Sequence, residues 1–276
     1  MEKKAIFLDI DGTLTVAGSN VPPDSALQAI RAAQDKGHRV FLCTGRNYDM
    51  LKPLLSYGFD GVVASAGGYI RCGEQVIYDC PMTEEQRKLV LDTLEQHGIF
   101  RTVECLDGSY TDDGFKAFLE EHAGDGGNSE LLRWRRQIEE ELNIRSMREY
   151  MGQPVYKVVV MSLDRNSMEQ AGKLLEKDFS FCMQEADRYG IVNGEVINRQ
   201  FDKGQALICV CQHLHIPLED SIAFGDSMND KEMMETAGYS VCMENGSDTL
   251  KKLADEVCPG VEQDGLYQAF VGLGLA

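Results

Sequence analysis

Apolar runs and helical patterns alternate along both ends of the chain. Short runs rich in apolar and β-branched residues read as strands, and longer segments between them read as helices. The expected strands span 5–8, 39–43, 62–64, 69–72, 75–78, 221–224 and 240–243, and the expected helices span 24–36, 48–56, 203–213, 231–237 and 248–253. Asp24 follows two prolines and is the expected N-cap of the first helix. Strands alternating with helices indicate a parallel sheet, so the sequence predicts an α/β fold.

The pattern changes between residues 82 and 190. Thr83 and Gln86 have the spacing of a capping box, which predicts the start of a helix. The other expected elements here are a helix at 166–177 and strands at 100–105, 155–161 and 179–184. Such a block is typical of an inserted α+β domain with its own small sheet. We therefore expect a discontinuous core of residues 1–81 and 191–276, interrupted by a domain of residues 82–190.

Composition narrows the classes of partner. The 276 residues include 27 basic and 45 acidic side chains, a formal net charge of −18, which argues against binding to nucleic acid or to an anionic membrane. The nine cysteines have no framework spacing and fit a reducing compartment. The apolar run at 5–8 is too short for a signal peptide, and no run is long enough for a membrane helix. The expected location is the cytoplasm, and the oligomeric state cannot be read from the sequence.

Two carboxylates follow the first expected strand. Asp9 and Asp11 are two positions apart and precede Gly12 and Thr13. Residues two apart in an extended chain point to the same side, so both carboxylates should project together. Their repulsion is tolerable when a divalent cation lies between them or when they divide acid and nucleophile roles. The alternative is a plain strand that ends in an Asp-Gly turn.

Three further segments place polar groups where core elements meet. Thr44 and Gly45 follow the second strand, where a hydroxyl and backbone N–H groups suit phosphate oxygens, although a plain turn would look the same. Lys203 begins a helix, where its charge opposes the helix dipole unless an anion is shared, and the alternative is a solvated surface lysine. Asp226 and Asp230 lie between a strand and a helix, where capping alone could explain one of them.

Together these segments suit phosphoryl transfer from a monoester. Asp9 could attack phosphorus and form an aspartyl-phosphate, while Asp11 protonates the leaving oxygen and then activates water. Mg²⁺ prefers a few carboxylates, waters and a substrate phosphate oxygen, and Asp9, the backbone carbonyl of Asp11 and Asp226 would provide that environment. Lys203 and Thr44 would hold the remaining phosphate oxygens.

The motifs resemble those of a known enzyme family. Asp9-Ile10-Asp11-Gly12-Thr13, Thr44-Gly45-Arg46, Lys203-Gly204 and Gly225-Asp226-Ser227-x-x-Asp230 are similar to the four motifs of haloacid dehalogenase-like phosphatases, and their spacing resembles the Cof-type subfamily. The resemblance implies a Mg²⁺-dependent phosphatase acting on a small phosphorylated metabolite, often a sugar phosphate. It also implies a Rossmann-like core and a large α/β cap. Asp230 is then expected to orient the metal site, with Gly12 and Asn229 in support.

One departure and two alternatives remain open. The subfamily usually has Asn-Gly-Ala after the third strand, where this chain has Ala66-Gly67-Gly68, so Ser65 or the backbone would have to replace the missing Asn side chain. A phosphomutase would use the same aspartyl-phosphate, and the motifs do not separate it from a phosphatase. A non-catalytic phosphosugar-binding protein is the third possibility, but a binder has no need of the nucleophile Asp9.

Overall fold

The computed structural model describes residues 3–115, 144–184, 186 and 190–276, and the chain forms two compact units. The first unit comprises Met1–Arg46, Leu51–Asp79 and Phe201–Ala276, and the second comprises Asn47–Met50 and Cys80–Gln200. The expected division at residue 190 falls ten positions early, because β11 (Val192–Asn198) pairs with strands of the second unit.

The first unit is built on an eight-stranded sheet with the order β14-β13-β12-β1-β2-β3-β4-β5. Its strands are β1 (Ala5–Leu8), β2 (Arg39–Cys43), β3 (Gly61–Ala64), β4 (Tyr69–Cys72), β5 (Gln75–Asp79), β12 (Ser221–Gly225), β13 (Tyr239–Met243) and β14 (Glu256–Cys258). β4 and β5 form an antiparallel hairpin at one edge, and the other strands are parallel. The parallel α/β core that the sequence predicts is confirmed.

The register aligns the carboxyl ends of the central strands. Leu8 at the end of β1 is paired with Leu42 on one side and Phe224 on the other. The loops that follow β1, β2 and β12 therefore leave the sheet at the same edge. Ligands of open parallel sheets bind at this edge.

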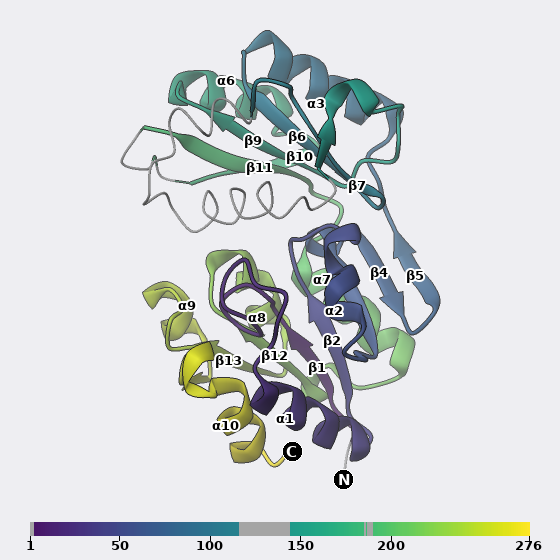
Figure 1. Ribbon diagram of the computed structural model, residues 1–276, viewed down its shortest axis with the longest axis vertical. Coiled ribbons are helices and arrows are strands. Elements are labelled where there is room, and N and C mark those ends of the chain that lie inside the picture. The colour runs from purple at the N-terminus through teal and green to yellow at the C-terminus, as the bar shows by residue number, and fades with distance from the viewer. Residues whose placement is uncertain (1–2, 116–143, 185, 187–189) are drawn as a thin grey trace. The chain divides into compact units, whose positions relative to one another are not determined.

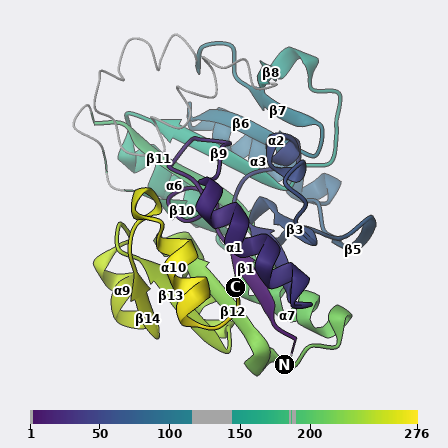
Figure 2. The same ribbon diagram turned by 60° about the horizontal axis from the view of Figure 1, so that its bottom comes forward.

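Helices cover both faces of this sheet. They are α1 (Asp24–Asp35), α2 (Lys52–Leu55), α7 (Lys203–Leu214), α8 (Lys231–Thr236), α9 (Asp248–Leu253) and α10 (Gly265–Gly272). α1 and α10 lie side by side on one face (Figures 1 and 2), where Phe224 packs on Phe270 with ring centroids 5.3 Å apart. α7 and α8 contact each other, and their apolar residues pack against Phe7 and Phe41 on the other face. Because side chains alternate along a strand, each strand contributes to both apolar layers.

Two local expectations in this unit need correction. Pro23 is the N-cap of α1 and makes no side-chain cap bond, while Asp24 is the first helical residue. Proline fixes the extended backbone before the helix, and Asp24 adds an acidic side chain to the first turn. The segment expected as a helix at 48–56 is a short 3₁₀ turn, Asp49–Leu51, followed by the single-turn α2.

The second unit has a six-stranded sheet with the order β10-β11-β9-β6-β7-β8. Its elements are α3 (Glu84–Gln96), β6 (Phe100–Cys105), β7 (Gly108–Thr111), β8 (Ile144–Ser146), β9 (Lys157–Ser162), α6 (Arg165–Leu175), β10 (Phe179–Met183) and β11. The capping box predicted at Thr83 is confirmed: Thr83 accepts from the Gln86 N–H at 3.2 Å and donates its own N–H to the Gln86 side chain at 3.0 Å. α3 and α6 share an apolar cluster with the sheet, including Val103 and Val158.

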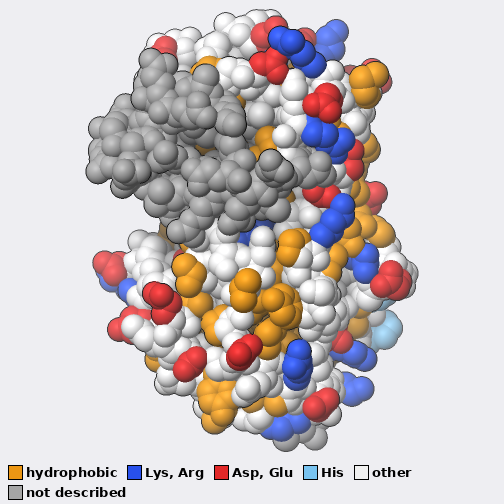
Figure 3. Space-filling view, in the orientation of Figure 1, with side chains coloured by type: hydrophobic (Ala, Val, Ile, Leu, Met, Phe, Trp, Pro, Cys, Tyr) orange, Lys and Arg blue, Asp and Glu red, His pale blue; other side chains and the backbone are white. Residues whose placement is uncertain are grey.

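The described surface has both charged and apolar areas. Figure 3 shows apolar side chains gathered on the visible face of the first unit, with acidic and basic groups around them. The exposed apolar residues of this unit include Val16 and Val21 on the loop between β1 and α1. Across the ranges that the structure describes, no helix is both long enough and apolar enough to cross a membrane.

Candidate active site

The candidate site lies where the parallel strands of the first unit end. Asp9 directly follows β1, Thr44 follows β2 and Asp226 follows β12. Because β12, β1 and β2 are neighbours in the sheet, Asp226, Asp9 and Thr44 lie side by side in that order at the carboxyl ends of the strands. The expectation that distant motifs meet here is thus matched by the topology.

A buried lysine connects two carboxylates in this site. The Lys203 Nζ donates to Asp9 Oδ1 and to Asp230 Oδ1, each at 2.6 Å. Lys203 and Asp230 are 2% and 0% exposed, and Asp9 is 4% exposed. Lys203 is the first residue of α7, whose N-cap is Asp202 through a 2.7 Å bond to the Gln205 N–H. The solvated-lysine alternative is therefore wrong.

Asp230 also fixes the loop that carries Asp226. Its Oδ2 accepts hydrogen bonds from the backbone N–H groups of Asp226 and Ser227, both at 3.1 Å. With Oδ1 on Lys203, this carboxylate joins the β12 loop to α7. These contacts tie the segment that carries Asp226 to the first residue of α7.

The site holds more negative than positive charge. Carboxylate oxygens of Asp9, Asp226 and Asp230 all lie within 4.8 Å of one another. Burial, with the nearby Asp230 carboxylate, raises the pKa of Asp9 to about 7. Burial, with repulsion from Asp9 and Asp230, raises the pKa of Asp226 to about 8. One lysine does not balance three carboxylates, so a further cation would relieve the repulsion.

Lys203 stays charged in this environment. Burial by itself would lower its pKa, but the carboxylates of Asp230 and Asp9 outweigh burial and raise the pKa well above its ordinary value. The site thus contains one permanent cation beside a cluster of hard oxygen donors. A donor set of this kind fits Mg²⁺ better than a softer metal ion.

Gly12 allows the first loop to approach Asp226. Its φ is +92°, and a Cβ at this position would lie 2.4 Å from Asp226 Oδ2. The Gly12 carbonyl accepts from the Asn245 side chain at 2.8 Å, and the Thr13 hydroxyl donates to Asp226 Oδ1 at 3.2 Å. Only glycine meets both demands, so the supporting role expected for Gly12 has a steric basis.

The Asp11 side chain is not part of the carboxylate cluster. Arg46 holds it with two parallel bonds, Nε to Oδ2 at 2.8 Å and Nη2 to Oδ1 at 2.6 Å, and the Gly18 N–H donates to Oδ1 at 2.7 Å. Arg46 is only 3% exposed and also donates to Asn20 at 2.6 Å. Asp11 lies beyond the end of β1, where the two-residue alternation no longer applies. Its charge still contributes to the raised pKa of Asp9, but its carboxylate is held by Arg46 and Gly18.

Arg46 is the functional candidate that sequence reasoning missed. It directly follows Thr44 and Gly45, so its place in the motif was the available signal. Thr44 is 2% exposed and its hydroxyl accepts from the Arg46 N–H at 3.2 Å, while Gly45 continues the same loop. Asn229, expected in support, is exposed, and its side-chain oxygen accepts from the Ser227 hydroxyl at 2.7 Å.

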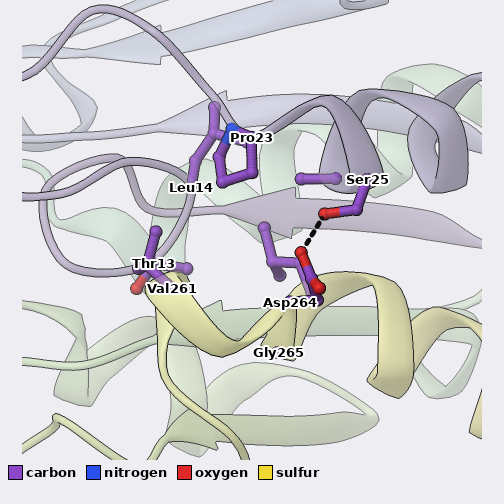
Figure 4. A pocket seen from close by; sticks show the side chains of 9 residues that line it. Thr13, Leu14, Pro23, Ser25, Val261, Asp264 and Gly265 are labelled. Carbon is purple, nitrogen blue, oxygen red and sulfur yellow. Dashed lines mark hydrogen bonds between the residues drawn. The ribbon is translucent and has the colours of Figure 1, made fainter.

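A small hollow lies beside the loop that follows β1 (Figure 4). It is lined by residues from the first loop, α1 and the start of α10, and the Ser25 hydroxyl donates to Asp264 across it at 2.6 Å. Thr13 is shared between the hollow and the site, whereas Asp9, Lys203 and Asp226 do not line it. The hollow is therefore separate from the carboxylate cluster, apart from Thr13.

Comparison with known proteins places these motifs in a family. Residues 6–270 match the profile of the haloacid dehalogenase-like hydrolases. Phosphatase YwpJ of Bacillus subtilis (strain 168) is 28% identical over 280 residues, which cover 95% of this chain and 97% of YwpJ. From the same organism, 5-amino-6-(5-phospho-D-ribitylamino)uracil phosphatase YwtE is 27% identical over 282 residues, 95% of each chain. A solved haloacid dehalogenase-like hydrolase from B. subtilis has the same fold, with a TM-score of 0.79 and 24% identity over 98% of this chain and 99% of that chain.

Proposed function

This chain belongs to the haloacid dehalogenase-like hydrolase family, and we propose that it is a Mg²⁺-dependent phosphatase that hydrolyses a small phosphomonoester through an aspartyl-phosphate on Asp9. The observation that carries the proposal is the buried Asp9 carboxylate, held at 2.6 Å by Lys203 beside the carboxylates of Asp226 and Asp230. A nucleophile, a fixed cation and a potential metal site then lie within one small volume.

The charge imbalance supports a divalent cation. Asp9, Asp226 and the backbone carbonyl of Asp11 would hold Mg²⁺, because hard oxygen donors with excess negative charge are its preferred ligands. When bound, the ion supplies positive charge that offsets the phosphoryl group and aids its transfer. Lys203 at the start of α7 and Thr44 after β2, both 2% exposed, would bind phosphoryl oxygens.

The first half of the reaction transfers the phosphoryl group to the protein. A carboxylate oxygen of Asp9 attacks phosphorus, and the bond between phosphorus and the leaving oxygen breaks. Asp11, in its protonated form and released from Arg46, gives its proton to that oxygen, so the product leaves as a neutral alcohol. Lys203 fixes the orientation of Asp9 and offsets its charge as the anionic phosphoryl group approaches.

The second half returns the protein to its starting state. A water molecule attacks phosphorus, Asp11 takes the proton of that water, and the bond between phosphorus and Asp9 breaks to release inorganic phosphate. The Asp11 carboxylate must leave the Arg46 fork to reach either the leaving oxygen or the water. Arg46 is thus expected to govern how Asp11 is presented to the reaction.

The substrate class is proposed from the groups that the site offers to a phosphoryl group and from the relatives of the chain. The site provides charged groups for one phosphoryl group, and the family relatives include YwtE, whose name specifies a phosphorylated ribitylaminouracil. We therefore propose a small phosphorylated metabolite, with a sugar phosphate as the first class to test. The second unit is the proposed cap that selects the leaving group.

Hydrolysis of p-nitrophenyl phosphate tests the proposal. Wild-type protein should release p-nitrophenol with Mg²⁺, and chelation with EDTA should stop the reaction. Asp9→Asn should be inactive. The matched control is Asp60→Asn, which should remain active: Asp60 is not part of the carboxylate cluster, and it pairs with Arg39 at an N–O distance of 2.6 Å. Equal release by wild type and Asp9→Asn would rule out the nucleophile.

A further inference from the structure

A serine hydroxyl beside the site has no hydrogen-bond partner among the described residues. Ser65 follows β3, it is 0% exposed, and its Oγ is buried without a donor or acceptor. Buried polar groups are nearly always hydrogen-bonded, because an unpaired one loses its water without compensation. The Ser65 hydroxyl therefore carries a cost that folding alone does not explain.

The turn that contains Ser65 lies between the two segments expected to hold phosphate. The Ser65 N–H donates to the Arg46 carbonyl at 2.8 Å, and the Ala66 N–H donates to the Thr44 carbonyl at 2.9 Å. On its other side, a Cβ on Gly67 would lie 2.6 Å from the Asp202 carbonyl oxygen, next to Lys203. The turn is thus fixed directly against the Thr44 loop and the start of α7.

The backbone of this turn is held in an uncommon conformation. Ser65 and Ala66 have φ values of +50° and +57°, in the left-handed region that residues with side chains seldom occupy. Two successive residues of this kind store strain, and such strain gathers at functional sites. The two backbone N–H bonds fix this conformation while leaving the hydroxyl unused.

We infer that the Ser65 hydroxyl donates a hydrogen bond to a phosphoryl oxygen of the bound substrate, as a third phosphate-binding group beside Thr44 and Lys203. The inference rests on the proposed function, since it assigns a residue to the same site. Thr44 and Lys203 are buried like Ser65, and the turn that contains Ser65 contacts both the Thr44 loop and the residue before Lys203. The inferred bond also gives the unpaired hydroxyl a partner that is present only in the complex.

Two substitutions remove the hydroxyl in different ways. Ser65→Ala keeps a Cβ in the left-handed conformation, whereas Ser65→Gly removes the Cβ and the strain with it. In titration calorimetry with inorganic phosphate and Mg²⁺, both should bind phosphate about tenfold more weakly than wild type, as expected for a lost hydrogen bond to a charged acceptor. Without phosphate, the melting temperature of Ser65→Ala should equal or exceed that of wild type, since an unpaired buried hydroxyl is gone.

Ser221 provides the matched control. It is equally buried at 0% exposure, but its hydroxyl donates to the Leu218 carbonyl at 2.6 Å and accepts from the Gly238 N–H at 3.0 Å. It is the first residue of β12, so it lies at the opposite end of that strand from Asp226. Ser221→Ala should lower the melting temperature and leave phosphate affinity unchanged, which is the reverse of the Ser65→Ala result.

The outcomes separate this inference from the proposed function. Wild-type phosphate affinity in both Ser65 variants, in a protein that hydrolyses p-nitrophenyl phosphate, would overturn the role of Ser65 alone. A lower melting temperature with unchanged affinity in Ser65→Ala would likewise assign the serine to structure. Weaker phosphate binding by the Ser65 variants of a protein that hydrolyses no ester would support Ser65 and overturn the hydrolysis.

Discussion

Two buried lysines, one in each unit, are placed between two carboxylates. Lys203 contacts Asp9 and Asp230, each at 2.6 Å, and Lys157 contacts Glu195 at 2.6 Å and Glu104 at 3.4 Å. Both lysine side chains are at most 2% exposed. The residue types are nearly the same, so their difference must come from where the backbone places them.

Lys157 and its partners lie within regular strands. Lys157 on β9 is directly opposite Glu104 on β6, and Glu195 is on β11, the other neighbour of β9. Cross-strand pairs of opposite charge are ordinary sheet stabilisation. Lys203, by contrast, collects carboxylates from loops that follow separate strands, and Asp226 adds a third acid with a raised pKa. We infer that the charges around Lys157 stabilise the sheet and that the charges around Lys203 serve to bind a ligand.

The largest effect should come from Asp9→Asn. Removing the proposed nucleophile should lower kcat by at least about 10⁴-fold, because the phosphoryl group would lose its proposed acceptor. The free energy of unfolding without Mg²⁺ should not fall, since a carboxylate with a raised pKa is replaced by a neutral amide. Steady-state kinetics and urea unfolding measure both. Retained activity would contradict a catalytic role for the carboxylates around Lys203.

Lys203→Met should have the next largest effect on activity. Loss of this cation should lower kcat about 10²- to 10³-fold, the usual cost of removing a preorganised charge from an active site. Lys4→Met is the matched control. Lys4 pairs with Asp220, is partly exposed and precedes β1, so it lies at the end of the strands away from the site. Equal kinetics for the two variants would show that Lys203 is only structural.

Lys157→Met should have the opposite signature. Glu104 would remain buried without its cation, and removing one partner of a buried pair costs about 3–5 kcal/mol of stability. The activity of each folded molecule should stay near the wild-type value. Urea unfolding together with kcat per active molecule checks this. A large loss of kcat with unchanged stability would move Lys157 into the functional class.

The effect of Mg²⁺ on stability should depend on pH. The folded pKa values of about 7 for Asp9 and about 8 for Asp226 lie above the ordinary value of 3.8. Their contribution to stability is therefore present at acidic pH and is lost as pH rises through about 7 to 8. Because Mg²⁺ binds the deprotonated carboxylates, it should raise the melting temperature more at about pH 9 than at about pH 6.

Calorimetry with and without MgCl₂ measures this shift. Asp226→Asn is the control and should lose most of the Mg²⁺-dependent increase in melting temperature. A Mg²⁺ effect that is equal at both pH values would contradict competition between the metal ion and protons at these carboxylates.

The sequence predicted those parts of the fold that depend on local pattern. The strands at 5–8 and 39–43 and the capping box at Thr83 were found because apolar runs and capping residues are local signals. β7, β8 and β14 were missed because they are short, with polar or charged residues and little alternation. Pairing with a neighbouring strand, which the sequence does not show, makes them strands.

The sequence also predicted part of the site, through the position of polar residues at the ends of strands. Ligands of parallel sheets bind at the carboxyl ends of the strands, and this rule predicts from the sequence that Asp9 and Asp226 lie at the same end of the sheet. The Arg46–Asp11 fork depends on a turn beyond β1, which the two-residue alternation does not describe. The unpaired Ser65 hydroxyl depends on every neighbour in three dimensions, so a sequence motif cannot reveal it.

Trapping the covalent intermediate tests the central claim most directly. Wild-type protein is mixed with p-nitrophenyl phosphate and Mg²⁺, quenched in acid within the first turnover, digested and examined by mass spectrometry. The account predicts a single added phosphoryl group on the peptide that contains Asp9, absent from Asp9→Asn. Phosphoryl on another residue, or rapid hydrolysis by Asp9→Asn, would contradict it.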